Sequence, residues 1–334
     1  MVVWLQRQWC NTNLWHGLLI PLSWLFFSVT TLRRLAYRFH LLTTHQFSIP
    51  VIVVGNISIG GTGKTPLVIY LVQQLQLRGW RPGVISRGYG GTADVPTAVT
   101  PDSDPLVVGD EPLLIARRTQ CPLWIGRNRP AAARTLLAVY PEVNIIISDD
   151  GLQHYALART INIAVIDGAR GFGNMRVLPA GPLREPLSRL TQMNATLIIN
   201  QTGSIHPSIP TALPHYPMHL QGTQFTQLKQ PQTTTTAQHF IGKPIHAVAG
   251  IGNPQRFFDQ LIAMGLTIIP HAFPDHHQYQ VHDLNFSDII IMTEKDAVKC
   301  QSFATEHMWV YAVDAQLPDV FIANILTQLG NHHG

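Results

Sequence analysis

The chain has 334 residues, of which 46% are hydrophobic and 13% are charged, so it can bury a large core and favours two domains over one. Its net charge of +4 is mild, and no basic run or aromatic-interleaved patch indicates nucleic-acid binding. A modest positive balance with so few charges suits an anionic membrane surface or a phosphorylated ligand better. The three cysteines lie far apart, which indicates neither a disulfide framework nor a zinc site and fits a reducing cytosol.

The amino-terminal segment is apolar. No formal charge occurs between Arg7 and Arg33, but His16 and Pro21 interrupt a run that would need about 20 apolar residues to span a membrane. Four of the seven tryptophans fall within the first 24 residues and arginines follow at positions 33, 34 and 38, which is typical of a segment at the headgroup level. We therefore expect residues 1–40 to form an interfacial anchor, with a spanning helix and a buried packing helix as successive alternatives.

A glycine-dense turn lies between a β-branched run at residues 51–54 and an apolar periodic segment at residues 67–75. This order, ending the turn in Gly-Lys-Thr, predicts a phosphate-binding loop between a strand and a helix. Its backbone N–H groups can surround phosphate oxygens, Lys64 adds a charge near the β- and γ-phosphates, and the Thr65 hydroxyl can ligate Mg²⁺. Ser58 stands where the strict pattern has glycine. The residues expected to hold the nucleotide are Ser58, Ile59, Gly60, Gly61, Thr62, Gly63, Lys64 and Thr65.

Two acidic pairs follow this loop along the chain. Asp149 and Asp150 end a hydrophobic strand at residues 143–148, which is the form of a Walker B element that holds a carboxylate beside the metal. With Thr65, they are expected to form the Mg²⁺ region. Asp110 and Glu111 open a helix-like segment, where acids often only complement the helix dipole but are also placed as an acid/base pair would be.

Alternating strands and helices from residue 50 to about 200 predict a parallel, doubly wound α/β sheet like that of P-loop NTPases. Pro, Thr, Gln and His dominate residues 206–238, so we place a linker at 206–240, after a P-loop domain at 41–205 and before a smaller α/β domain at 241–334. In this last domain we interpret Gly250-Ile251-Gly252 as a plain βα turn. Thr293-Glu294-Lys295-Asp296 is interpreted as a helix capping box.

Seven short motifs follow one another along nearly the whole chain: Gly60-Gly61-Thr62-Gly63-Lys64-Thr65-Pro66, Arg87-Gly88-Tyr89-Gly90, Gly109-Asp110-Glu111-Pro112, Asp149-Asp150-Gly151-Leu152-Gln153-His154, Pro182-Leu183-Arg184-Glu185, Asp275-His276 and Thr293-Glu294-Lys295-Asp296. In this order, after a tryptophan-rich amino terminus, the chain resembles the tetraacyldisaccharide 4'-kinases of lipid A biosynthesis.

The resemblance implies transfer of the γ-phosphate of ATP, with Mg²⁺, to the 4'-hydroxyl of a tetraacylated glucosamine disaccharide 1-phosphate, giving lipid IVA. It implies a peripheral or monotopic enzyme at the cytoplasmic face of the inner membrane, whose partners are the lipid substrate and an anionic membrane surface. We expect a monomer. By the same resemblance Asp110 is the catalytic base and His276 its partner, although the adjacent His277 is an alternative. Other motif positions expected to shape the acceptor or nucleotide pocket are Arg87, Tyr89, Glu111, Gln153, His154, Arg184 and Glu185.

Two other classes of function compete with this interpretation. A P-loop regulatory NTPase would need a guanine-selecting Asn-Lys-x-Asp after a strand, but the chain has Asn200-Gln201-Thr202-Gly203 there and Lys295 stands one place late in its own motif. A membrane-tethered nucleotide-binding scaffold would make Asp110 and His276 incidental. ADP release with ATP or GTP, with and without a lipid disaccharide in detergent, separates these classes.

Overall fold

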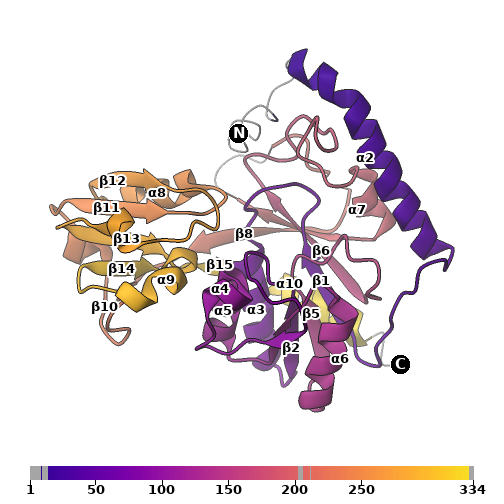
Figure 1. The fold of residues 1–334 in the computed structure, drawn as a ribbon, viewed down its shortest axis with the longest axis horizontal. Helices are drawn as coiled ribbons and strands as arrows, with labels where there is room; N and C mark the ends of the chain where they lie inside the picture. Colours follow the sequence, from indigo (N-terminus) through magenta and orange to yellow (C-terminus); the bar gives the residue numbers. More distant parts are fainter. Residues whose placement is uncertain (1–8, 10–13, 202–205, 211, 331–334) are drawn as a thin grey trace.

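Two β-sheets organise the chain in the computed structural model, which describes residues 9, 14–201, 206–210 and 212–330 (Figure 1). Within these residues the larger sheet has nine strands, in the order β15 (Asp314–Gln316), β8 (His215–Gln221), β7 (Thr196–Asn200), β6 (Ile161–Asp167), β1 (Val51–Gly55), β5 (Ile145–Ser148), β2 (Pro82–Ser86), β4 (Leu123–Ile125) and β3 (Thr97–Ala98). The smaller sheet has six, in the order β10 (Thr234–Thr235), β9 (Phe225–Gln227), β14 (Met308–Tyr311), β13 (Ile289–Thr293), β11 (Ile245–Ala249) and β12 (Ile268–Ala272).

The larger sheet is parallel from β8 to β4, and only its edge strands β15 and β3 run antiparallel. Successive residues of β1 point to opposite faces and feed two different cores. One face is covered by α3 (Lys64–Gln76), α5 (Asp110–Thr119) and α10 (Asp319–Gly330), and the other by α6 (Arg129–Val139) and α7 (Ser188–Gln192). The predicted doubly wound α/β sheet is confirmed.

The smaller sheet is parallel from β14 to β12, and β9 and β10 join it antiparallel. Helix α8 (Pro254–Ala263) packs Phe257, Phe258 and Leu261 on one face, and α9 (Glu294–Cys300) places Ala297 and Cys300 in a second core. The remaining short helices are α4 (Pro105–Val108), η1 (Ala237–Phe240), η2 (Val281–Leu284) and η3 (Gln301–Phe303).

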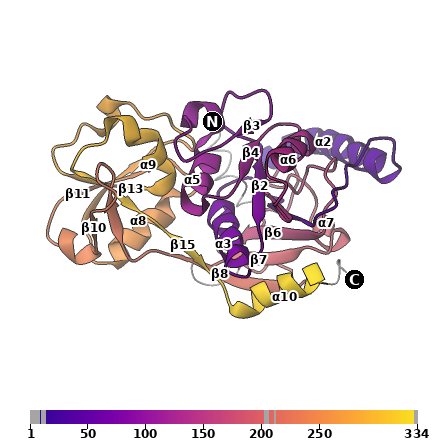
Figure 2. The ribbon, with the colours of Figure 1, turned by 90° about the horizontal axis from the view of Figure 1, so that it is seen from below.

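The chain passes between the two sheets more than once (Figure 2). The expected linker at 206–240 carries β8 of the larger sheet followed by β9 and β10 of the smaller one. After β14 the chain returns as β15, which pairs with β8, and α10 then buries Phe321 and Ile322 in the core beside α3. Residues 314–330 therefore belong to the larger sheet's layers although they fall within the expected C-terminal domain. The division into domains stays a prediction.

Each sheet together with the helices packed on it is called a lobe, the larger or the smaller. Helix α2 (Leu14–Arg38) runs along the outside of the larger lobe, on the side away from the smaller sheet (Figures 1 and 2). Its Ser23 hydroxyl donates to the Val177 carbonyl oxygen and accepts from the Ala180 N–H, each over 3.0 Å. Leu18 is 74% exposed and Trp24 69%, so a buried packing helix is excluded over the described part. Residues 17–38 are long and apolar enough to cross a membrane, which suggests membrane association. Trp4, part of the predicted headgroup belt, lies outside the described residues.

Candidate active site

The phosphate loop joins β1 to α3, and α3 begins at Lys64. Gly60 and Gly63 have φ of +117° and +94°, a region that residues with a Cβ rarely enter. Ser58 has no positive φ; it is buried and forms a bridge to Leu183. A side chain is therefore tolerated at this position, which explains the departure from the strict motif.

Side chains from elsewhere in the larger sheet's lobe hold the loop in this shape. The Asn200 amide, at the end of β7, donates to the Thr62 carbonyl over 2.9 Å, and Asn56 donates to the Gly60 carbonyl over 3.3 Å. Arg170 donates to the Ile59 carbonyl over 3.1 Å and lies where a Cβ on Gly60 would be. These three supports were not predicted from the sequence, because nothing local marks Asn200 or Arg170 as a neighbour of the loop.

Asp149 follows β5 and is 1% exposed. Its Oδ2 accepts from the Ser86 hydroxyl over 3.1 Å, whereas its Oδ1 is buried without a hydrogen-bond partner among the described residues. Burial, together with the negative charges of Glu111 and Asp150, raises the pKa of Asp149 to about 6. The site thus contains a buried carboxylate oxygen without a hydrogen-bond partner in the described part of the chain, on a group whose pKa stays raised despite the charges of Lys64 and Arg129.

The pKa of Asp150 is shifted in the opposite direction, downward. Burial alone would raise its pKa, but Lys64, 3.5 Å away, and Arg184, 3.1 Å away, outweigh that effect and hold the pKa at about 2. Arg129 adds a further hydrogen bond to the Asp150 carbonyl over 3.2 Å. Asp150 is therefore fully ionised and already neutralised by the protein, which distinguishes it from Asp149.

The structure brings Asp110 and His276 together from the two lobes. The His276 Nδ1 lies 3.0 Å from both carboxylate oxygens of Asp110, and Tyr89 packs against the imidazole with ring centroids 4.9 Å apart. His277 points elsewhere, with its Nε2 3.0 Å from Asp283. The alternative partner is therefore not at Asp110.

Asp110 is 4% exposed and stays ionised. Burial would raise its pKa, but the hydrogen bond from His276, the largest opposing effect, acts with the charge of Lys295 to lower the pKa below its ordinary value. Asp110 is the first residue of α5, which precedes the parallel strand β4, so it lies at the carboxyl edge of the sheet, as the phosphate loop does.

The capping-box interpretation of residues 293–296 is wrong in part. The Thr293 hydroxyl does accept from the Asp296 N–H over 3.2 Å, but the Asp296 carboxylate accepts from that hydroxyl and from the Gly250 N–H, not from the Thr293 backbone. The two residues between them reach the other lobe: Arg118 donates to Glu294 over 2.7 Å, and Lys295 donates to Glu111 over 2.8 Å. A local motif thus carries a contact between lobes.

The predicted Gly250-Ile251-Gly252 turn leads from β11 to α8, as expected for a βα turn. Packing also requires glycine at position 252, because a Cβ there would lie 2.5 Å from the Gly61 backbone nitrogen. Arg256 in α8 also pairs with Asp167 of the larger sheet over 3.2 Å. The smaller lobe therefore packs directly against the phosphate loop.

The remaining predicted site residues are either hydrogen-bonded within the protein or exposed. Glu185 is buried and accepts from Tyr155 and from Arg189, while Gln153 donates to the Asn56 carbonyl over 3.1 Å. These two residues support the loop's surroundings. Arg87 and Tyr89 are exposed and available to a ligand.

Buried Arg129 and half-buried His154 complete this side of the site. Arg129, which was not predicted, is 2% exposed and donates to the Ser148 hydroxyl over 2.9 Å. His154 has a buried Nε2 without a partner among the described residues. Burial and the charges of Arg129 and Arg159 lower the pKa of His154 to about 4, so its ring is neutral at physiological pH.

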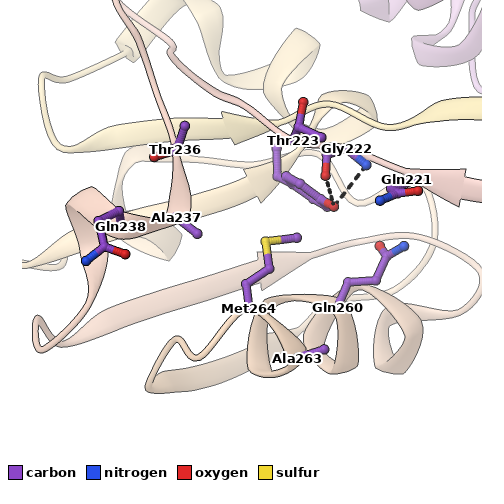
Figure 3. Close-up of a pocket in the computed structure, with 10 residues that line it drawn as sticks. Gln221, Gly222, Thr223, Thr236, Ala237, Gln238, Gln260, Ala263 and Met264 are labelled. Carbon is purple, nitrogen blue, oxygen red and sulfur yellow. Dashed lines mark hydrogen bonds between the residues drawn. The ribbon is translucent and has the colours of Figure 1, made fainter.

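A separate pocket of about 490 Å³ lies between η1 and α8, near the passage from β8 to β9 (Figure 3). The Tyr311 hydroxyl, which donates to the Gly222 carbonyl over 3.0 Å, lies at its edge. Its lining consists of Gln221, Gly222, Thr223, Thr236, Ala237, Gln238, Gln260, Ala263, Met264 and Tyr311. This lining has no carboxylate, lysine, arginine or histidine.

Comparisons with known proteins point to one family. A family model described as tetraacyldisaccharide-1-P 4'-kinase matches residues 15–330. The tetraacyldisaccharide 4'-kinase of Methylobacillus flagellatus is 52% identical over 328 residues, covering 98% of this chain and 96% of its own length, and that of Azoarcus sp. is 48% identical over 319 residues, covering 95% and 92%. The structure of LpxK from Aquifex aeolicus in complex with ATP matches with a TM-score of 0.78 at 25% identity, covering 96% of this chain and 99% of that chain. The chain therefore belongs to the tetraacyldisaccharide 4'-kinase family, the ATP-dependent phosphotransferases of lipid A biosynthesis.

Proposed function

We propose that this enzyme transfers the γ-phosphate of ATP to the 4'-hydroxyl of a tetraacylated glucosamine disaccharide 1-phosphate, giving lipid IVA, and that Asp110 accepts the hydroxyl proton. The hydroxyl oxygen forms a bond to the γ-phosphorus, the bond from that phosphorus to the β,γ-bridging oxygen breaks, and ADP leaves. One observation carries the proposal: a buried, ionised carboxylate held over 3.0 Å by an imidazole from the opposite lobe, at the sheet edge that bears the phosphate loop. Such a group suits proton transfer from a positioned hydroxyl.

At the nucleotide end, residues 58–65 would hold the triphosphate through backbone N–H groups and the start of α3. In this proposal the Lys64 ammonium group moves from Asp150 to the phosphates when ATP binds. Its contact with Asp150 is long, at 3.5 Å, and Arg184 stays on Asp150 at 3.1 Å when Lys64 turns to the phosphates. Asp150 thus keeps a partner, and no isolated buried charge is created.

The described residues fit Mg²⁺. The Oδ1 of Asp149 is a buried carboxylate oxygen without a partner, and Thr65 offers a hydroxyl in the first turn of α3. No group of three or more His, Cys, Asp or Glu side chains in the described part of the chain could hold a metal alone. Mg²⁺ does not require one, since it is commonly held by one or two carboxylates, phosphates and water. When bound, the ion would neutralise charge on the phosphate oxygens.

At the lipid end, the exposed apolar face of α2 would rest in the cytoplasmic leaflet of the inner membrane, where ATP and the acyl chains meet. Arg33, Arg34 and Arg38 would lie near anionic headgroups. The exposed Arg87 and Tyr89 are the best placed of the predicted acceptor residues, while Glu111, Gln153, His154, Arg184 and Glu185 would act from buried or bonded positions. We expect the enzyme to work as a monomer.

A transfer assay with a defined tetraacyl disaccharide 1-phosphate in mixed micelles tests the proposal. ATP should give one phosphate on the 4'-oxygen and one ADP per product, and GTP should be a poor donor. ADP release that does not depend on the lipid would instead indicate a regulatory NTPase. Deleting residues 1 to about 30 should leave a folded core that loses membrane binding, and unchanged partitioning into vesicles would contradict an anchor in that segment.

A further inference from the structure

His276 lies between two carboxylates and one ammonium group. Its Nδ1 is 3.0 Å from Asp110, and its Nε2 is 3.8 Å from the Oδ1 of Asp275. The Nζ of Lys295 is 3.5 Å from the same Nε2, and Tyr89 covers the ring. Two carboxylates and one ammonium group thus face the two nitrogens of one ring.

Lys295 is held beside the Nε2 of His276 as a cation. Its ammonium donates to Glu111 over 2.8 Å and to Asp275 over 3.0 Å, and its side chain is only 15% exposed. Burial would lower the pKa of Lys295, but the charges of Glu111, Asp110 and Asp275 raise the pKa above its ordinary value, so it stays a cation. An ammonium can only donate hydrogen bonds. The Nε2 of His276 can meet it only as an acceptor, which leaves the ring proton on Nδ1, directed at Asp110.

We propose that Lys295 is a positioning residue that keeps the Nε2 of His276 unprotonated, so that a neutral imidazole with its proton on Nδ1 holds Asp110. The effect of Lys295 on catalysis rests on the proposed role of Asp110 as the proton acceptor. An imidazolium would bind the carboxylate through a charge-assisted hydrogen bond, about twice as strong as a neutral one, and would make it a weaker base. Glu111, adjacent to Asp110 in α5, fixes the ammonium from the larger lobe, which gives both residues of that acidic pair a role.

Nitrogen-15 NMR of the full chain labelled in histidine and held in detergent tests this directly, because protonated and unprotonated ring nitrogens have well-separated shifts. A His276→Gln spectrum assigns the signals. At neutral pH the wild type should show a protonated Nδ1 and an unprotonated Nε2, whereas Lys295→Met should show Nε2 protonated. Lys229→Met is the matched control, since it removes an exposed lysine paired with Glu306 and should leave His276 unchanged. A protonated Nε2 in the wild type, or an unprotonated one in Lys295→Met, overturns the proposal.

Kinetics add a second readout. Lys295→Met should lower kcat by about tenfold with the KM for ATP changed less than about twofold, and Lys295→Arg should restore both the Nε2 state and much of kcat. A loss of kcat that Lys295→Arg does not recover, with Nε2 unaltered in Lys295→Met, would mean a merely structural lysine. If instead Asp110→Asn turns over normally while Nε2 still depends on Lys295, the proposed proton acceptor is wrong and the assignment to Lys295 stands.

Discussion

The phosphate loop and the Asp110–His276 pair are positioned in different ways. The loop is one continuous segment, and its shape is set by glycine conformations and by hydrogen bonds from within one lobe, such as those of Asn56 and Asn200. Asp110 and His276 lie 166 residues apart and meet only because α5 and the loop after β12 pack across the contact between lobes. Small shifts of the smaller lobe should therefore affect proton transfer more than nucleotide binding, although Gly252 of that lobe also lies against Gly61 of the loop.

The largest expected effect is at the pair. Asp110→Asn should lower kcat by roughly 10²–10⁴-fold, because the amide still fits beside His276 but cannot take the proton. ATP affinity, measured by calorimetry, should stay within about twofold of the wild type. Asp102→Asn, at an exposed position in the same lobe, is the control. Near-normal turnover of Asp110→Asn would end the general-base assignment.

Lys64→Ala tests the other region. It removes the charge expected at the β- and γ-phosphates, so kcat should fall by roughly 10²–10³-fold, the cost typical of removing one preorganised donor. Unlike Asp110→Asn, it should also weaken ATP binding, which the same calorimetry reports. The exposed Lys243→Ala should change neither quantity. Wild-type turnover in a well-folded Lys64→Ala protein would remove the loop from the mechanism.

A double-mutant cycle sharpens the comparison within the pair. His276→Ala should lower kcat by roughly 10–100-fold, less than Asp110→Asn, because it removes the group that orients the base and leaves the base itself. The double variant should lose much less than the product of the two single losses. Multiplicative losses would show that the two residues act independently.

Gly252→Ala pushes the lobes apart at the phosphate loop and does not contact Asp110 or His276. Its Cβ would lie 2.5 Å from the Gly61 nitrogen, so the smaller lobe must shift, and kcat should fall by about tenfold while each lobe stays folded. Gly330→Ala, where a Cβ meets nothing within 4 Å, is the control. If ATP affinity falls while kcat is kept, the two regions are not separable in the way described.

The smallest effect concerns stability. The pKa of Asp149 is raised to about 6 in the folded protein, so the stability of its protonated form is fully present below about pH 4 and is lost as pH rises through 6. Asp149→Asn should therefore stabilise the ligand-free protein above pH 7, by about 1 kcal/mol or roughly 2–4 °C in Tm. Thermal scans at pH 5 and pH 8 test this, because the difference from wild type should narrow at pH 5. If the wild type were more stable than Asp149→Asn at pH 8, the raised pKa of Asp149 would be contradicted.

Much of the larger sheet could be predicted from the sequence. The β-branched runs of β1, β5 and β6 are buried on both faces, so they appear as continuous apolar stretches whichever neighbours they take. The strand–loop–helix form of the predicted phosphate loop was predictable for a different reason, since its glycines and Gly-Lys-Thr act within eight residues. The path of β15 and α10 back to the larger sheet was not predictable, because an apolar pattern shows that a face is buried but not against which sheet.

The sequence by itself determined the phosphate loop, the acidic ends of the strands and the family, because these depend on residue types at fixed short spacings. Only the tertiary structure decided that His276 rather than His277 meets Asp110, that Lys295, inside the predicted capping box, reaches Glu111 of the other lobe, and that the pKa values of Asp149 and Asp150 shift in opposite directions. The physical reason is that hydrogen bonds and charges act over a few ångströms in space, and chain neighbours such as Asp149 and Asp150 can face entirely different surroundings.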